Sequence, residues 1–222
     1  MQSPSKRVEW IVWGAIGLTI AAIVAAFVVM RVRQGGAREP LPVLFPVADF
    51  TLTNQAGRPF STTELRGKVW LAGIIFTRCG GPCPRMTQRL AELQEAIPGT
   101  LPVQFVTLTT DPGFDTPAVL KAYAQRFKAD PARWSFLTGT KAQIVAAAVG
   151  SLKLTAMEKE AGKMENPNDM FIHSTILVAV DKQGRARAVI ETEPPDELPP
   201  EQTLKQMIRT NALPIIERLL RE

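Results

Sequence analysis

The hydrophobic pattern of the chain begins with one long apolar stretch near the N-terminus. Residues 10–30 carry no charge and are nearly all apolar, with basic residues on both sides. A helix over these 21 residues would rise by about 30 Å, the thickness of the hydrocarbon core of a bilayer. The apolar region of a cleaved signal peptide is shorter, about 7–15 residues, and a small-residue cleavage site follows it, which is missing here. The pattern therefore predicts one membrane anchor.

The same pattern divides the chain into four segments. Residues 1–9 form a short tail, 10–30 the transmembrane anchor, 31–46 a linker rich in glycine and proline, and 47–222 a folded domain. A domain of about 175 residues can bury a full core. Basic residues flank the anchor in similar number on both sides, so charge barely decides its orientation. From the commonest arrangement of such chains, we expect a single-pass protein of the cell inner membrane with the domain on the periplasmic side.

Short apolar runs and amphipathic stretches alternate through the domain. The run from Val69 to Phe76 is continuously apolar, as expected of a buried central strand. The segment after Pro84 is apolar at helical spacing, and Pro98 and Gly99 end it. Expected strands cover 50–53, 69–76, 103–108, 134–137, 174–180 and 186–190, and expected helices cover 84–97, 115–127, 140–149 and 201–220. This order predicts an α/β fold, with helices on both faces of a central sheet and a β-hairpin at its N-terminal end.

Composition and charge exclude one class of partner. The net charge is +5 and the pI about 9.5, but lysine and arginine are mixed with acidic residues and form no basic block. A solvated surface explains this mixture, so we expect no nucleic-acid partner.

The two cysteines of the chain lie together after the expected central strand. Cys79 and Cys83 form a C-x-x-x-C motif directly before the helix that begins near Pro84. Sites in open α/β sheets form at the carboxyl edge of the strands, and a redox-type pair at this place favours a thioredoxin-like fold. Since a helix N-terminus favours the thiolate, we expect the pKa of Cys83 to be lowered most. Gly80 and Gly81 allow the loop to fold back so that both sulfurs converge.

Three interpretations of this cysteine pair follow from the residues alone. A structural disulfide would close too small a loop to restrict the unfolded chain much. A redox-active dithiol fits the position, but thioredoxin-like oxidoreductases usually have a cis-proline where this chain has His173 and Ser174. The third interpretation is a soft-metal site, with His173 as third ligand, because the loop before the 174–180 strand lies against the cysteine loop in a thioredoxin-like fold. Two thiolates and an imidazole suit monovalent copper. A structural zinc site requires a fourth ligand, and divalent copper would require an added oxygen donor.

Charged residues flank the cysteines and follow the second core strand. Arg78 and Arg85 would stabilise a thiolate or steer an acidic partner, although a solvated role explains them equally well. Asp111 fits a turn and Asp115 a helix cap, so a structural role is expected for both. Asp111 lies at the same sheet edge as the cysteines, where it could support metal ligands.

Several blocks of residues resemble the SCO/SenC family of cytochrome oxidase assembly factors. The resemblance spans about 48 to 190 and rests on Phe76-Thr77-x-Cys79-x-x-x-Cys83-Pro84, on Thr109-x-Asp111-Pro112-x-x-Asp115-Thr116-Pro117, and on His173-Ser174 before an apolar strand that ends at Asp181-x-x-Gly184. The resemblance implies a thioredoxin-like fold and a copper ion held by Cys79, Cys83 and His173. This chain departs from the family pattern by Gly80-Gly81 in place of Pro-Asp and by Ile172 in place of an Asp before the histidine.

The resemblance also implies a function. A metallochaperone of this kind delivers copper to the binuclear copper centre of cytochrome c oxidase, or keeps the cysteines of that centre reduced. Its implied partners are the membrane, the copper-bearing subunit of the oxidase and a copper donor protein. The alternative is an enzyme, a membrane-anchored thiol-disulfide oxidoreductase in which Cys79 and Cys83 are the redox dithiol.

Overall fold

The computed structural model describes residues 6–36, 39–158, 171–192 and 207–222. The chain separates into two compact units, Met1–Pro40 and Leu41–Glu222. The first unit is the helix α1 (Lys6–Gly36). Its stretch Trp10–Met30 is 21 residues long, apolar enough to cross a membrane, and has no buried residue. The helix predicted at 10–30 is therefore present and extends beyond the apolar stretch at both ends.

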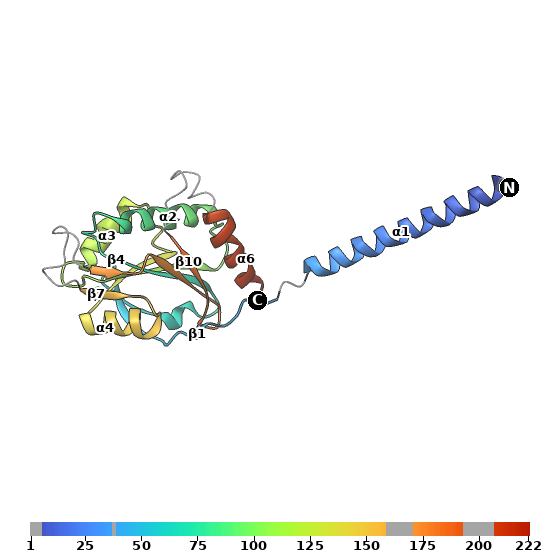
Figure 1. The fold of residues 1–222 in the computed structure, drawn as a ribbon. Helices are drawn as coiled ribbons and strands as arrows, with labels where there is room; N and C mark the ends of the chain where they lie inside the picture. Colours follow the sequence, from blue (N-terminus) through green and yellow to red (C-terminus); the bar gives the residue numbers. More distant parts are fainter. Residues whose placement is uncertain (1–5, 37–38, 159–170, 193–206) are drawn as a thin grey trace. The chain divides into compact units, whose positions relative to one another are not determined.

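The second unit is built on one eight-stranded mixed sheet (Figure 1), whose strands follow the order β1-β10-β9-β4-β5-β6-β2-β3. The bounds are β1 (Phe45–Pro46), β2 (Thr51–Asn54), β3 (Pro59–Ser61), β4 (Val69–Ile75), β5 (Val103–Thr109), β6 (Trp134–Thr138), β9 (Ile176–Val180) and β10 (Arg185–Glu191). Strands β4, β5 and β6 are parallel, whereas β9 runs antiparallel to β4. A separate antiparallel pair joins β7 (Ala156–Glu158) to β8 (Phe171–His173).

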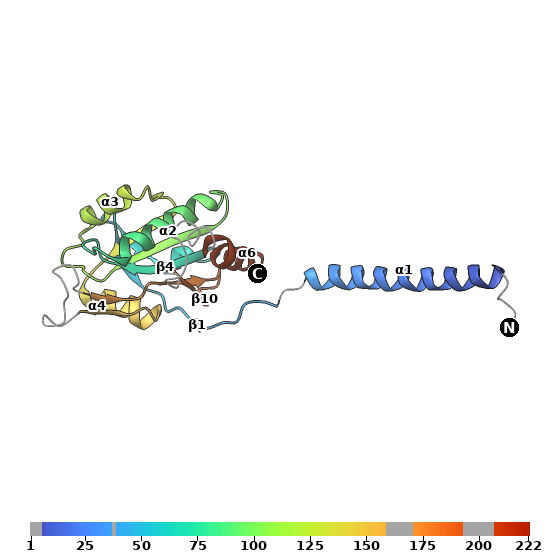
Figure 2. The same cartoon turned by 45° about the horizontal axis from the view of Figure 1, so that its top comes forward.

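Helices cover both faces of the sheet (Figures 1 and 2). Alternate residues of β4 enter two different cores, because successive side chains of a strand point to opposite faces. Leu71 and Ile75 pack with α2 (Pro82–Ala96), α3 (Pro117–Arg126) and α6 (Leu213–Arg221). Trp70 and Ile74 pack with α4 (Lys141–Val145) and the π-helical turn that follows it (Ala146–Ser151). This arrangement confirms the α/β prediction with a buried central strand.

The expected N-terminal hairpin is also present, whereas β1 and the start of β9 depart from the prediction. Strands β2 and β3 pair with each other and join the sheet through β6. The segment expected to be a linker ends in β1, which pairs with β10 through only two residues. The strand expected from Ser174 begins at Ile176, because Ser174 bonds back to Thr155 through its backbone and its side chain. His173 thus belongs to β8 and not to the segment leading into β9.

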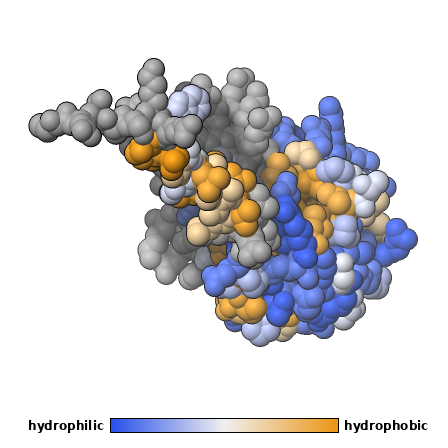
Figure 3. All heavy atoms as spheres, turned by 90° about the vertical axis from the view of Figure 1, so that its right-hand side faces the viewer, coloured by the Kyte–Doolittle hydropathy of each residue, from blue (hydrophilic) through white to orange (hydrophobic). Residues whose placement is uncertain are grey.

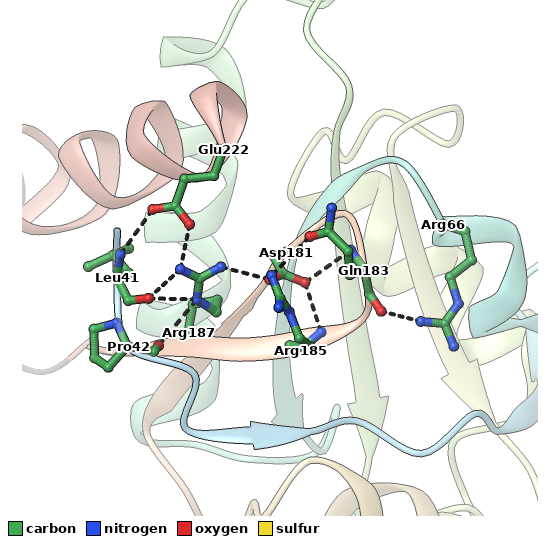
Figure 4. Close-up of polar contacts among 8 residues, drawn as sticks. All are labelled: Leu41, Pro42, Arg66, Asp181, Gln183, Arg185, Arg187 and Glu222. Carbon is green, nitrogen blue, oxygen red and sulfur yellow. Dashed lines mark hydrogen bonds and ion pairs between the residues drawn. The ribbon is translucent and has the colours of Figure 1, made fainter. Parts of the chain in front are cut away.

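A buried arginine joins three parts of the domain that are distant in sequence (Figure 4). The guanidinium of Arg187 in β10, 3% exposed, donates to the carbonyl oxygens of Leu41 and Pro42 and to the carboxylates of Asp181 and Glu222. The backbone N–H of Leu41 donates in turn to Oε1 of Glu222 at 3.0 Å. These bonds fix the start of the domain, the β9–β10 turn and the end of α6 to one another. We call this set of residues the arginine clamp.

The surface of the molecule is mixed in character. On the side that Figure 3 shows, hydrophilic residues cover much of the described surface and hydrophobic residues form separate patches. Large hydrophobic residues exposed on the second unit include Val43, Leu44, Leu101, Phe114 and Val189. Single exposed apolar side chains are normal on soluble domains.

The close packing of β4 against β9 gives a prediction for Gly73. A Cβ atom at this residue would lie 2.8 Å from Cδ2 of Leu177, a buried side chain that cannot move without disturbing its neighbours. We expect Gly73→Ala to lower the free energy of unfolding by about 1–3 kcal/mol, as overpacking of a core does. Urea unfolding of the full chain in detergent micelles measures this effect. Gly150→Ala is the matched control, because a Cβ there meets nothing within 4 Å; equal stability of the two variants would contradict the prediction.

Candidate metal centre

The sheet presents the cysteine loop at the carboxyl end of β4. The strand ends at Ile75, and α2 begins at Pro82, so that Cys79 lies in the loop and Cys83 in the first turn of the helix. The backbone N–H of Cys79 donates to the carbonyl oxygen of Phe76 at 3.2 Å, which turns the chain back after the strand. The helix thus begins two residues before Pro84, the position at which the sequence placed its first turn.

The two thiols contact each other but have different surroundings. Cys79 is partly exposed, whereas Cys83 is completely buried. The Sγ atom of Cys83 accepts a bond from the N–H of Phe76 at 3.4 Å, and that of Cys79 accepts from the N–H of Gly81 at 3.4 Å. Neither cysteine forms a disulfide bond in this structure. The loop therefore brings two soft sulfur donors together, as its two glycines indicated.

The prediction of a lowered pKa for Cys83 is wrong. Burial raises the pKa of the Cys83 thiol, and a hydrogen bond with Cys79 raises it further, while the N–H of Phe76 acts in the opposite direction. Removal from water outweighs the dipole of the helix, because a thiolate loses its hydration in the core. Cys83 is therefore a buried thiol and not an exposed thiolate.

Two carboxylates of the loop between β5 and α3 hold the residues before Cys79. Asp115 is fully buried and accepts bonds from the backbone N–H and the hydroxyl of Thr77 and from the hydroxyl of Thr109. Burial raises the pKa of Asp115, against the lowering effect of these bonds. Asp111 accepts two bonds from the guanidinium of Arg78, the shorter at 2.5 Å. These contacts link the ends of β4 and β5 beside the cysteine loop.

The structural role expected of Asp115 is correct, but its role as helix cap is not. The N-cap of α3 is Thr116, whose hydroxyl accepts from the N–H of Val119 at 3.4 Å. Asp115 instead binds Thr77 and Thr109, two residues that the sequence analysis did not single out as partners. The block Thr109-x-Asp111 with Asp115-Thr116 was the sequence feature that could have predicted these contacts, since it places hydroxyls and carboxylates at one sheet edge.

The backbone of His173 forms the last residue of β8. It pairs with Ala156 of β7, directly before the contact between Ser174 and Thr155. In that contact the N–H of Thr155 donates to Oγ of Ser174 at 2.7 Å. Ligation of a metal by the imidazole together with Cys79 and Cys83 stays a prediction.

The different burial of the two cysteines predicts different reactivity. In the reduced, metal-free chain, iodoacetamide is expected to alkylate Cys79 at least about ten times faster than Cys83, because the thiolate is the nucleophile and Cys83 is buried with a raised pKa. Mass spectrometry of the two modified sites over time measures both rates. Chains unfolded in urea serve as the control, in which the rates should converge. Equal rates in the folded chain would contradict the burial of Cys83.

Comparison with known proteins places this site in a family. The SCO1/SenC family matches residues 45–209, which covers the described fold from β1 to β10 and both cysteines. The chain belongs to the SCO1/SenC family. The resemblance of the sequence to SCO/SenC proteins is confirmed, together with the thioredoxin-like fold.

Individual relatives and a solved structure agree with this assignment. The SCO1 homologue of Bacillus subtilis is 32% identical over 153 residues, 68% of this chain and 76% of that protein. A protein of Stutzerimonas stutzeri named for copper binding is 31% identical over 154 residues, 68% of this chain and 71% of its own length. The solved structure of BsSco, a Sco family cytochrome c oxidase assembly protein in which a disulfide switch was identified, is 28% identical, with a TM-score of 0.60 over 79% of this chain and 99% of that one.

Proposed function

We propose that this SCO1/SenC protein is a membrane-anchored metallochaperone that carries monovalent copper on Cys79, Cys83 and His173. In this proposal it delivers copper to the binuclear copper centre of cytochrome c oxidase or keeps the cysteines of that centre reduced. The observation that carries the proposal is the contact between the thiols of Cys79 and Cys83 at the carboxyl end of β4. Two sulfur donors in a partly buried site suit a soft monovalent cation. The names of the relatives, for copper binding and for oxidase assembly, support the same cargo and target.

Transfer of copper would begin at the exposed side of the pair. Cys79 is the thiol that a partner can reach, whereas Cys83 is enclosed by the core. A thiolate of the acceptor would replace Cys79 on the metal first, and His173 and Cys83 would follow as further acceptor ligands arrive. Loading requires that Cys83 lose its proton, so copper affinity should rise with pH.

Anchoring to the inner membrane is part of the proposal. The apolar stretch Trp10–Met30 has the length and composition of a spanning helix. We further propose that the domain lies on the periplasmic side, with a copper donor protein and the oxidase subunit as its partners. The anchor limits the domain to the membrane that holds the oxidase.

Titration with monovalent copper tests the metal site. The reduced full chain, in detergent micelles and without oxygen, is titrated against a competing chelator beside His173→Ala and the matched control Gln183→Ala. The control lies in the turn between β9 and β10, at the other end of β9 from β8. We expect one-to-one binding that weakens by at least about tenfold in His173→Ala only, since each 1.4 kcal/mol of lost ligation is a factor of ten. Weak binding, or binding that is indifferent to His173→Ala, would overturn the copper site.

The second candidate function is thiol-disulfide exchange. The contact between the two thiols favours it, since a disulfide can form from this pair while two electrons and two protons pass to a partner disulfide, which becomes a dithiol. A disulfide between Cys79 and Cys83 would exclude copper. Turnover with a dithiol donor that survives His173→Ala would favour this function over the metallochaperone.

A further inference from the structure

The loop that carries Cys79 contains two glycines that contribute no packing. A Cβ atom at Gly80 or Gly81 would meet no other atom within 4 Å. Glycine has the widest choice of backbone conformations, so two in succession make a segment that is costly to order. A ligand beside such a segment needs other contacts to keep it in place.

Arg78, the residue directly before Cys79, supplies such contacts. Its Nε and Nη2 atoms donate to the same oxygen of Asp111, at 3.2 and 2.5 Å. The side chain of Arg78 is 37% exposed and that of Asp111 only 11% exposed. Asp111 is itself fixed, because its backbone N–H donates to the hydroxyl of Thr109 at 2.9 Å. Bonds between charged partners are shorter and stronger than neutral ones, so this pair ties the cysteine loop to the end of β5.

An aromatic ring covers the guanidinium of Arg78. Its central carbon lies 4.3 Å from the centroid of the Phe114 ring. Phe114 is 44% exposed and belongs to no hydrophobic core of the described residues. The ring attracts the cation and so helps to hold the guanidinium beside Asp111. A large exposed phenylalanine at this place is thereby explained by its contact with Arg78.

We infer that Arg78, Asp111 and Phe114 are positioning residues that hold Cys79 in the place where it can bind metal. Cys83 needs no such support, because it lies within α2 and is enclosed by the core. The support therefore acts on one of the two sulfur ligands, the accessible one. The expected effect on copper affinity rests on the proposed copper site, but the order of the loop can be measured without metal.

The test uses the full chain in detergent micelles with Arg78→Gln and Asp111→Asn. Arg66→Gln is the matched control, since it removes a bidentate, half-exposed pair with Asp49 outside the cysteine loop. NMR order parameters of the amides of Cys79–Gly81 are expected to fall from about 0.85 to below 0.6 in both site variants of the metal-free protein. The affinity for monovalent copper, measured against a chelator, is expected to fall about five- to tenfold, with the melting temperature within about 3 °C of the parent.

Further variants separate positioning from general loss of structure. Arg78→Lys keeps the charge but not the two-donor fork and should recover part of the loop order, and Phe114→Leu should give an intermediate loss. The double variant Arg78→Gln/Asp111→Asn should be no worse than either single one, because the two residues act through one bond. Unchanged order parameters in Arg78→Gln, or equal losses in Arg66→Gln, would overturn the inference. If the parent chain binds no copper, the proposed function fails, and the order parameters still decide the positioning role.

Discussion

Replacement of Cys83 by serine is expected to lower the affinity for monovalent copper by about a thousandfold. A structural metal site of four ligands contributes about 10–16 kcal/mol, so the loss of one strong ligand costs on the order of 4 kcal/mol. Serine has nearly the shape of cysteine but keeps its proton at neutral pH and offers a hard oxygen in place of a soft thiolate. The buried position of Cys83 excludes water that could replace the lost ligand.

The measurement is again a titration of the reduced full chain against a competing chelator. Met86→Leu is the matched control, because Met86 lies three residues further along α2, is almost fully buried and also carries sulfur. We expect this volume-conserving change to alter the affinity by less than about twofold. Binding by Cys83→Ser within tenfold of the parent would mean that the cysteine pair does not hold the metal. An equal loss in Met86→Leu would extend the donor set into α2.

The largest expected effect on stability comes from Arg187→Met in the arginine clamp. The change leaves Asp181 and Glu222 without one cationic partner and the carbonyl oxygens of Leu41 and Pro42 without their described side-chain donor. Removal of one member of a buried ionic network costs about 3–5 kcal/mol, because the remaining groups stay out of water. Urea unfolding of the full chain measures the loss.

Arg185→Met is the matched control for this prediction. Arg185 binds the same carboxylate of Asp181 at 2.8 Å, but its side chain is 41% exposed. A half-exposed pair contributes about 1 kcal/mol or less, so the two arginines should differ several-fold in effect. Equal losses would show that burial of Arg187 does not decide the strength of the clamp.

Acid provides a second measure of the clamp. Burial alone would raise the pKa of Asp181, but the bonds from Arg185 and Arg187 outweigh it and hold that pKa below its ordinary value. The stabilisation is thus complete above the unfolded pKa of about 3.9 and is lost as the pH falls through the lower folded value. Arg187→Met should make the fall of stability below about pH 4 shallower. An unchanged slope would contradict this assignment.

The sequence predicted those elements whose hydrophobic pattern extends over many neighbouring residues. The apolar run at 69–76, the helical spacing after it and the cysteine pair between them were enough to place the site at the carboxyl end of β4. Strand β1 escaped prediction because two residues carry no periodicity. The pKa of Cys83 was predicted in the wrong direction because the helix start is visible in the sequence, whereas burial depends on neighbours distant in the chain.

The choice between two neighbouring caps shows the same limit. Asp115 and Thr116 are both good N-cap residues, and only Pro117 favours Thr116, because proline is enriched at the first helical position. The structure assigns the cap to Thr116 because Thr77 and Thr109 occupy the carboxylate of Asp115. The pair of Arg78 with Asp111 was likewise beyond reach of the sequence, since 33 residues separate its members.

The arginine clamp has a practical consequence for releasing the domain from its membrane helix. Two of the acceptors of Arg187 are backbone carbonyl groups of Leu41 and Pro42, directly after the first compact unit. A protease site or a fragment boundary placed after Pro42 would remove these carbonyls together with the N–H that binds Glu222. A cut at or before Pro40 would keep all three groups. The solubility and yield of a secreted, anchor-free version should therefore change abruptly across these two residues.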